Sequence, residues 1–258
     1  MALFQAGKLN DAIAAQLQAV KTAPGDQSKR LFLFELAAFA GDLDRARRQL
    51  DALDYEEVEL QAARSGYRQL LDSEGKRRRL FRDGLAPQFL IDPPAHVQVR
   101  LDALNRLREN RWAEAQTLLD EANNAVPALQ GQLNDAAFHD LRDADDRFGS
   151  VLEVFARGEY FWVPLEQVEL IAISPPRFPR DLLWIPARLE TIDASGEVFL
   201  PALYPNSHEH ADEQVKLGRM TDWRETGGPV LGAGLRMFLA GDETPTILEW
   251  RELKIDHA

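Results

Sequence analysis

The chain of 258 residues contains no cysteine. This absence excludes disulfide bonds, thiolate zinc sites, iron–sulfur clusters and cysteine nucleophiles, and it agrees with a reducing compartment. No run approaches the ~20 apolar residues that a membrane span needs. Residues 1–21 lack the basic stretch followed by an apolar stretch that is typical of a signal peptide. We therefore expect a cytoplasmic protein with no membrane association.

Signatures of common enzymes are also missing. The sequence contains neither the Gly-x-Ser-x-Gly turn of serine hydrolases nor a Walker phosphate loop. Residues 232–234, Gly-Ala-Gly, are too short for a dinucleotide-binding turn and precede an expected strand. We therefore expect no catalytic residues, no bound cofactor and no enzymatic activity.

Basic residues are scarce in the second half of the chain. The formal net charge is −12. Residues 1–130 hold 18 basic and 19 acidic side chains, whereas residues 131–258 hold 12 and 23. This difference favours a first domain over residues 1–130 and an acidic second domain over residues 131–258. An acidic half repels phosphates, which argues against sequence-independent binding of nucleic acid.

A short pattern recurs in the first half with the period of a tetratricopeptide repeat. Residues 7–12 (Gly-Lys-Leu-Asn-Asp-Ala) and residues 41–46 (Gly-Asp-Leu-Asp-Arg-Ala) lie 34 residues apart. Residues 110–115 (Asn-Arg-Trp-Ala-Glu-Ala) follow 69 residues later, close to two periods. We interpret the pattern as a turn between helices, in which Gly41 ends one helix in a left-handed conformation.

Helical periodicity surrounds these turns. Asn10 and Asp44 are suited to cap the helices that follow. Residues 9–20 show apolar positions at helical spacing, and residues 31–39 are apolar nearly all round, as in a helix buried between two neighbours. A further helix is expected at residues 46–53 and one or two over residues 58–82, and a last hairpin is marked by residues 97–107 and 118–122. The first half is therefore predicted to be a tetratricopeptide-like array of helical hairpins, whose concave side accepts a peptide or a helix.

After Pro127 the sequence changes to short runs of aromatic and β-branched residues between turn breaks, which predict strands. The expected strands cover residues 138–142, 160–163, 169–173, 182–192 and 198–204, with a final hairpin of residues 231–240 and 246–253. Short helices are expected over residues 150–156 and 212–220. The second half is therefore predicted to be an α+β domain, mostly strand and barrel-like.

A His-x-His-x-Asp run at His208, His210 and Asp212 has the spacing of a divalent-metal site, because imidazoles two residues apart can converge from a loop. The metallo-β-lactamase pattern continues with a histidine, where Glu213 stands here, and downstream there is only His257. An exposed polar loop is the preferred interpretation, so no metal is expected. A metal-dependent enzyme that uses this loop stays an alternative.

An acidic cluster contains Asp143, Asp145 and Asp146. It lacks the mid-loop glycine and terminal glutamate of an EF-hand, which argues against calcium binding. A structural role is expected instead, with Asp146 capping a turn and Arg147 paired internally.

A basic run comprises Lys76, Arg77, Arg78, Arg79 and Arg82. A solvated helix face is the preferred interpretation, and these five residues are also the candidates for partner binding. Given the overall charge, an acidic protein partner fits this run better than DNA.

Several short blocks have a characteristic order and spacing. The most specific is Gly-Glu-Tyr-Phe-Trp-Val-Pro at residues 158–164, and Arg-Asp-Leu-Leu-Trp-Ile-Pro-Ala follows at residues 180–187. The others lie at residues 33–46, 67–84, 143–149, 203–205, 222–223 and 234–237. Taken in order, the blocks resemble the ImpE family, also called TagJ or SciE-type proteins, of type VI secretion. Leu43, Phe148 and Leu235 depart from the family pattern and keep side-chain bulk better than polarity.

The resemblance covers almost the whole chain and implies a cytoplasmic accessory protein of a contractile secretion machine. In this family the protein binds the small sheath subunit through a helix of that subunit. It is also linked to sheath handling by the AAA+ disassembly ATPase. The family has no established catalytic residues, so the resemblance implies none here. A helical-repeat scaffold of another assembly stays an alternative.

Overall fold

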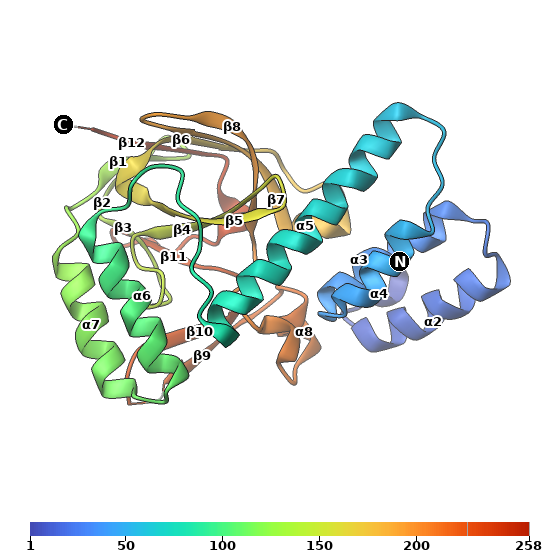
Figure 1. Ribbon diagram of the computed structural model, residues 1–258, viewed down its shortest axis with the longest axis horizontal. Helices are drawn as coiled ribbons and strands as arrows, with labels where there is room; N and C mark the ends of the chain where they lie inside the picture. The colour runs from blue at the N-terminus through green and yellow to red at the C-terminus, as the bar shows by residue number, and fades with distance from the viewer. Residues whose placement is uncertain (226, 258) are drawn as a thin grey trace.

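The computed structural model describes residues 1–225 and 227–257, with helices in the first half and mainly strands in the second (Figure 1). The helices are α1 (Ala2–Gln5), α2 (Leu9–Thr22), α3 (Gln27–Phe39), α4 (Leu43–Asp51), α5 (Val58–Asp83), α6 (Ala95–Arg108), α7 (Trp112–Asn124) and the short α8 (Glu213–Lys216). No helix within the described ranges is long and apolar enough to cross a membrane.

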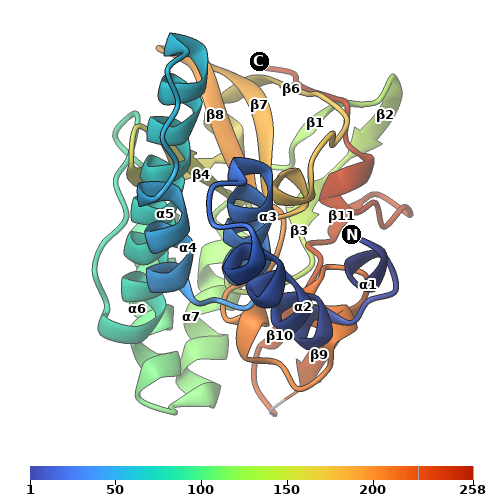
Figure 2. The same ribbon diagram turned by 90° about the vertical axis from the view of Figure 1, so that its right-hand side faces the viewer.

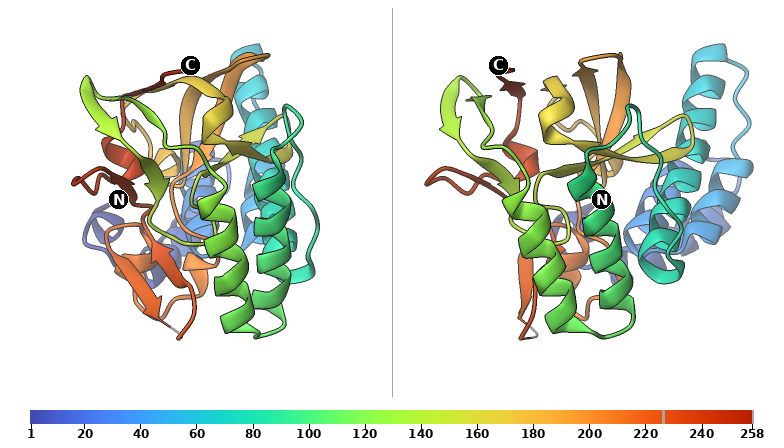
Figure 3. Two further views of the ribbon diagram at one scale, coloured as in Figure 1. Left: turned by 90° about the vertical axis from the view of Figure 1, so that its left-hand side faces the viewer. Right: turned by 60° about the vertical axis from the view of Figure 1, so that its left-hand side comes forward.

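The helical half is arranged around α5, a continuous helix of 26 residues. Helices α2, α3 and α4 pack in sequence order and α4 packs on α5, while α6 and α7 form a separate hairpin. Figures 1 and 3 show this hairpin on the far side of α5 from α2–α4. The helical half is therefore consistent with tetratricopeptide-like hairpins, but its last hairpin does not continue the stack of α2–α4.

The recurring turn is a real structural unit. Gly7, Gly41 and Asn110 have φ angles of +77°, +75° and +59°. Each stands two residues before the start of α2, α4 or α7. Left-handed backbone favours glycine and, among other residues, asparagine. The repeat in the sequence therefore marks a repeat of backbone conformation, as predicted.

The capping residues expected from the same pattern are wrong. Asp42, not Asp44, caps α4 by accepting the amide of Arg45 at 2.9 Å. Asn10 lies inside α2. The amides of Leu9 and Asn10 instead donate to the carboxylate of Glu213, each at 2.9 Å. A residue some 200 positions away thus stabilises the N-terminus of α2.

The strands form one large antiparallel sheet and two small ones. The strands are β1 (Gln130–Leu133), β2 (Ala136–His139), β3 (Leu141–Asp143), β4 (Val151–Ala156), β5 (Glu159–Pro164), β6 (Val168–Ile173), β7 (Trp184–Thr191), β8 (Ser195–Pro201), β9 (Thr221–Glu225), β10 (Val230–Gly234), β11 (Phe238–Ala240) and β12 (Glu252–Ile255). The large sheet has the order β2-β1-β12-β6-β7-β8-β4-β5. Strands β9–β10 and β3–β11 form the two small sheets.

The second half is therefore rich in antiparallel strands, as expected. Strands β2 and β5 end the large sheet and do not pair with each other among the described residues. The sheet is not closed, and the barrel-like detail of the prediction is not confirmed.

One local prediction in this half is wrong, and a second, the final hairpin, holds only in part, because Met237 and Thr246 do pair. Residues 150–156 were expected to be helical, but residues 151–156 form β4. Its residues Val151–Phe155 are all buried, and a strand covered on both faces lacks the alternation that marks strands in a sequence. The last strand, β12, pairs with β1 and β6 and not with the residues before it. A tight turn near Gly241 remains, because Phe238 bonds to Pro245 at 2.9 Å.

The hydrophobic core joins the two halves. Phe34 of α3 stacks on Trp184 of β7 with 6.3 Å between ring centroids, and Phe34 also stacks on Tyr67 of α5. Helix α7 ends at Asn124 and the strands begin at Gln130, close to the expected boundary, although the short α8 lies beyond it. The division into domains 1–130 and 131–258 stays a prediction, because the two halves share their packing.

Candidate functional site

The residues of the basic run on α5 point to different sides of the helix, so some are buried and others are exposed. Arg77 is only 4% exposed and points into the strand half. Its Nε and Nη2 atoms donate to the two carboxylate oxygens of Glu153 on β4, each at 2.7 Å. Nη2 also donates to the backbone oxygen of Leu203 at 2.7 Å. Arg77 is therefore an internal tie between the helices and the sheet.

The other basic residues of the run have different surroundings. Arg78 bonds to Glu74 at 3.1 Å and to the backbone oxygen of Gly41 at 2.7 Å. Lys76 donates to the backbone at the β4–β5 turn. Arg79 and Arg82 are exposed. Of the five candidates for partner binding, these last two are exposed, and the guanidinium of Arg82 is paired with the carboxylate of Asp83 at 2.7 Å.

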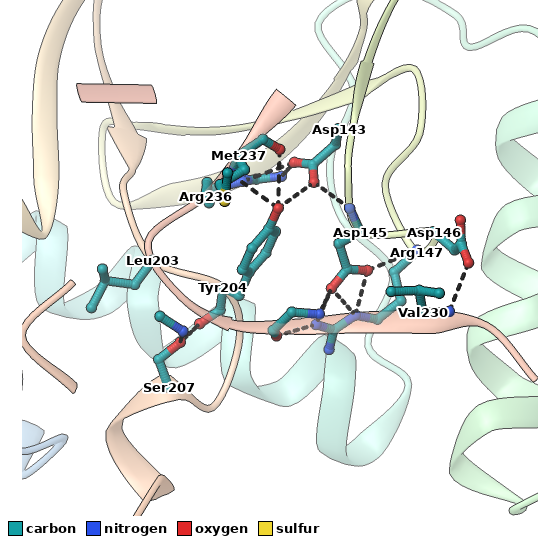
Figure 4. Close-up of polar contacts among 12 residues, drawn as sticks. Asp143, Asp145, Asp146, Arg147, Leu203, Tyr204, Ser207, Val230, Arg236 and Met237 are labelled. Atoms are coloured by element: carbon teal, nitrogen blue, oxygen red, sulfur yellow. Dashed lines mark hydrogen bonds and ion pairs between the residues drawn. The ribbon is translucent and has the colours of Figure 1, made fainter. Parts of the chain in front are cut away.

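Arg77 belongs to a fully buried cluster of charged groups, part of which is drawn in Figure 4. Arg236 lies at its centre, with Nη2 2.6 Å from Asp143 Oδ2 and Nη1 2.8 Å from Glu153 Oε2. The hydroxyl of Tyr204 donates to Asp143 Oδ1 at 2.8 Å. The cluster therefore links α5, β3, β4 and the segment before β11.

The acidic residues Asp145 and Asp146, noted in the sequence, extend this buried cluster toward β10. Arg147 is paired internally, as predicted, because its guanidinium bonds to the carboxylate of Asp145. Asp145 also accepts the amide of Gly232 at 2.7 Å. Asp146 does not cap a turn of its own segment but accepts the amide of Val230 at 2.7 Å. These aspartates fasten β10 to the core.

The positive charges of Arg77, Arg147 and Arg236 balance the negative charges of Asp143, Asp145 and Glu153 in this cluster. Burial raises the pKa of Asp143 to about 6 despite the guanidinium of Arg236 beside it. Burial alone also raises the pKa of Glu153, but Arg77 and Arg236 more than offset this and hold it below its ordinary value. Buried charges are tolerated when they are paired and hydrogen-bonded. Each carboxylate here has an arginine partner, so the cluster holds elements in place.

His208, His210 and Asp212 do not point toward one another. The ring of His208 lies over Gly41. His210 is hydrogen-bonded to Asp222 at 3.1 Å, and Asp212 caps α8 through a backbone amide. Across residues 1–225 and 227–257, no three His, Asp or Glu side chains are grouped so that they could hold a metal ion. This loop therefore has a structural role: His208 packs on the turn before α4, and Asp212 caps α8.

A cleft of about 370 Å³ lies between α5 and the large sheet. Tyr67 of α5 forms one wall, and Phe178 stands at the mouth with 50% of its surface exposed. Between them lies Arg180, whose guanidinium is 4.6 Å from the ring centroid of Tyr67 and 4.0 Å from that of Phe178. Arg180 also bonds to Glu35 of α3 at 2.6 Å. The helices and the strand half thus build this cleft together.

Sequence reasoning missed this cleft. Arg180 and Trp184 belong to the block at residues 180–187, which served as a sign of the family resemblance. The available signal was Phe178 in a Pro-rich segment, residues 175–179, ahead of a strand. An aromatic residue in such a segment belongs to neither a helical nor a strand pattern of apolar residues. This gives a weak reason to expect that its side chain is exposed.

Comparison with known proteins agrees with the resemblance of the sequence blocks. The family model described as ImpE protein matches residues 135–254. The type VI secretion system accessory component TagJ of Pseudomonas aeruginosa PAO1 is 34% identical over 255 residues, which cover 98% of this chain and 90% of that protein. The chain belongs to the ImpE family. A crystal structure of a Vibrio parahaemolyticus protein, 24% identical, has the same fold, with a TM-score of 0.90 over 100% of this chain and 97% of the other.

Several blocks that carry the resemblance to the ImpE family meet in the buried cluster. Arg77, Asp143, Tyr160, Tyr204 and Arg236 come from five of these blocks. Tyr160 donates to Glu153 at 2.5 Å, so the most specific block contacts the carboxylate that Arg77 and Arg236 also bind. These five blocks therefore meet at the joint between the two halves.

Proposed function

We propose that this protein is a non-enzymatic accessory protein of type VI secretion that binds the small subunit of the contractile sheath. The observation that carries the proposal is the similarity over nearly the whole chain to an accessory component of that system. In the proposed role, one helix of the sheath subunit docks on this protein in the cytoplasm. The bound protein then assists sheath handling by the AAA+ disassembly ATPase.

The distribution of charged groups supports an adaptor over an enzyme. The buried carboxylates of Asp143 and Glu153 are engaged by Arg236 and Arg77 and so are occupied in holding the fold together. General acid–base catalysis needs a titratable group within reach of a substrate. The cleft beside α5 combines aromatic and aliphatic side chains with Arg177, Arg180 and Asp181, a mixed surface of the kind that binds a protein ligand.

The test is a calorimetric titration of the full chain with the purified small sheath subunit. We expect a complex with a dissociation constant in the range of about 10 μM or tighter, and no binding after deletion of the docking helix from the sheath subunit. Absence of binding by folded protein at tens of micromolar would refute the proposal. A parallel titration with the ATPase, with and without the sheath subunit, decides whether that contact is direct.

A further inference from the structure

A second cleft, here called the α7 cleft, lies between the C-terminal end of α7 and strand β3 and has a volume of about 590 Å³. Figures 1 and 2 show the α6–α7 hairpin below the large sheet, with the C-terminal end of α7 toward the strands. The lining includes Asp120 and Asn123 of α7, Leu141 and Arg142 of β3, and the connecting residues 126–128. A cleft of this volume is large enough to hold a ligand.

The α7 cleft is acidic. Asp120, Asp140 and Asp146 line it, and the single basic residue among its described lining residues is Arg142. The carboxylates therefore exceed the guanidinium by two negative charges. The C-terminal end of a helix adds partial negative charge, and α7 ends at Asn124, beside the cleft. This arrangement attracts a cation.

The carboxylates of the α7 cleft keep unused acceptor capacity. Asp146 accepts the amide of Val230 through Oδ2, and Asp120 accepts from the side chain of Gln116 through Oδ1 at 2.8 Å. Neither carboxylate forms an ion pair with any residue that the structure describes. Burial and the neighbouring charge of Asp145 raise the pKa of Asp146 above its ordinary value, as expected of a carboxylate without a cationic partner.

A buried hydroxyl in the lining also lacks a partner. Ser150 is only 4% exposed, and its Oγ atom makes no hydrogen bond within residues 1–225 and 227–257. Buried polar atoms in folded proteins are nearly always hydrogen-bonded, because an unpaired one loses its contact with water without a replacement. A polar ligand in the α7 cleft would supply the missing bond.

The buried Arg100 of α6 contacts two residues of the lining without neutralising their carboxylates. Its guanidinium donates to Asn123 Oδ1 at 2.7 Å and to the backbone oxygen of Asp146 at 2.8 Å. Both acceptors are neutral, and Arg100 is fully buried. Arg100 therefore fixes the positions of Asn123 and of the backbone at Asp146, and it leaves the Asp146 carboxylate available.

The groups in the α7 cleft suit a guanidinium. Carboxylates only accept hydrogen bonds, and a serine hydroxyl can also accept. A guanidinium has five N–H donors in one plane, whereas an ammonium has three donors on a single point charge. One guanidinium thus has enough donors for two carboxylates and a hydroxyl. Residues 126–128, Val-Pro-Ala, add apolar surface against which the methylene groups of an arginine side chain can pack.

We propose that the α7 cleft binds an arginine side chain of a partner protein. In this complex the guanidinium bonds to the carboxylates of Asp120 and Asp146 and to the hydroxyl of Ser150. Its methylene groups pack on residues 126–128. The site lies outside the cleft beside α5, and it does not depend on the proposed contact with the sheath subunit.

The test is an NMR titration of the isotope-labelled full chain with a capped Gly-Arg-Gly peptide. The control peptide carries citrulline, which has nearly the same shape as arginine but no charge. We expect a dissociation constant on the order of 1 mM for the arginine peptide and binding at least about tenfold weaker for the citrulline peptide. Equal binding of the two peptides, or no binding of the arginine peptide at about 20 mM, would overturn the proposal.

Asp120→Asn and Asp102→Asn form a matched pair of variants that locates the binding. Both residues are exposed, and each accepts from a glutamine four positions earlier in its own helix, but Asp102 lies on α6 outside the lining. We expect Asp120→Asn to weaken binding of the arginine peptide at least about fivefold and Asp102→Asn to stay within about twofold of wild type. Equal effects of the two substitutions would show attraction by net charge alone and would overturn the site.

Ser150→Ala and Ser73→Ala form a second matched pair. Both hydroxyls are buried without a partner, but Ser73 lies on α5 and outside the lining. Removal of an unpartnered hydroxyl should not destabilise the fold, so both variants should melt no lower than wild type. Ser150→Ala should weaken binding of the arginine peptide at least about threefold, and Ser73→Ala should leave it unchanged. Unchanged binding by Ser150→Ala would overturn the contact with the hydroxyl.

Free L-arginine distinguishes a protein partner from a small-molecule ligand. Its α-carboxylate can pair with Arg142, which makes no ion pair or side-chain hydrogen bond within the described ranges, whereas the capped peptide presents only the side chain. We expect the peptide to bind at least as tightly as L-arginine. Tighter binding of L-arginine would overturn the assignment to a protein partner.

Discussion

Arg77 of α5 and Glu153 of β4 are 76 residues apart in the chain and form a bidentate ion pair, with both hydrogen bonds 2.7 Å long. The side chain of Glu153 is fully buried and also accepts from Arg236 and Tyr160. A single carboxylate thus connects the long helix to the centre of the strand half. The stability of the two halves is coupled through this contact.

Replacing Arg77 with methionine should strongly destabilise the protein. The substitution keeps much of the side-chain volume but removes one partner of a buried ion pair, which costs about 3–5 kcal/mol of unfolding free energy. Urea denaturation followed by circular dichroism measures the loss. Arg79→Met, at an exposed position on the same helix, should change stability by less than about 0.5 kcal/mol. A loss below about 1 kcal/mol for Arg77→Met would contradict the role assigned to this pair.

The strand half should not fold cooperatively by itself. A fragment of residues 131–258 lacks Arg77 and the cover that α5 gives to β4 and β5. We expect the isolated fragment to show no sharp unfolding transition, and co-expression with residues 1–130 to restore one. Calorimetric melting of the fragment and of the reconstituted pair makes the comparison. A cooperative transition in the isolated fragment would show that residues 131–258 are an independent domain.

Gly41→Ala should lower the free energy of unfolding, because a side chain fits neither the left-handed backbone of this residue nor the space around it. The φ angle is +75°, and an added Cβ atom would lie 2.0 Å from Cδ2 of His208. Left-handed backbone alone costs a non-glycine residue about 1–2 kcal/mol, so we expect a total above about 2 kcal/mol. Adding His208→Ala should recover part of the loss.

Gly66→Ala is the matched control for Gly41→Ala. Gly66 lies inside α5, and no atom stands within 4 Å of an added Cβ. Alanine favours helix over glycine by about 1 kcal/mol, so this variant should be neutral or more stable in urea denaturation. Equal effects of the two substitutions would show that the turn before α4 tolerates a side chain.

His208 should make the protein sensitive to mild acid. Burial, together with the charge of Arg78, lowers the pKa of His208 below its ordinary value. As pH falls, the unfolded chain binds this proton before the folded protein does, so stability decreases on acidification below about pH 6.5. His208→Gln should lose less stability than wild type between pH 7.5 and 5 in urea denaturation. Parallel pH profiles for the two proteins would rule out this contribution.

The turns of the helical half were predictable because they depend on local backbone chemistry. Gly7, Gly41 and Asn110 adopt the left-handed conformation that few other residues tolerate, so they leave a periodic mark in the sequence. The strands β5, β6, β7 and β8 were recognisable for a similar reason, since aromatic and β-branched runs between turns favour extended backbone. The family could also be recognised, because its blocks keep their order along the chain.

The candidate site was predictable only in fragments. The sequence presents Lys76, Arg77, Arg78 and Arg79 as one basic run, and nothing local distinguishes the buried Arg77 from the exposed Arg79. Their difference follows from where the strand half lies against α5. The cleft likewise needs Tyr67, Phe178 and Phe199, which come from three distant segments.

The sequence by itself determined the helical first half, the strand-rich second half and the family, because propensity, turn chemistry and block order are properties of short segments. Tertiary structure decided that Glu213 caps α2, that residues 151–156 form a strand and that Arg77 reaches Glu153. Each of these depends on a partner far along the chain or on burial from both sides. Burial and long-range pairing are set by how the halves pack, and a sequence pattern of short range carries no record of them.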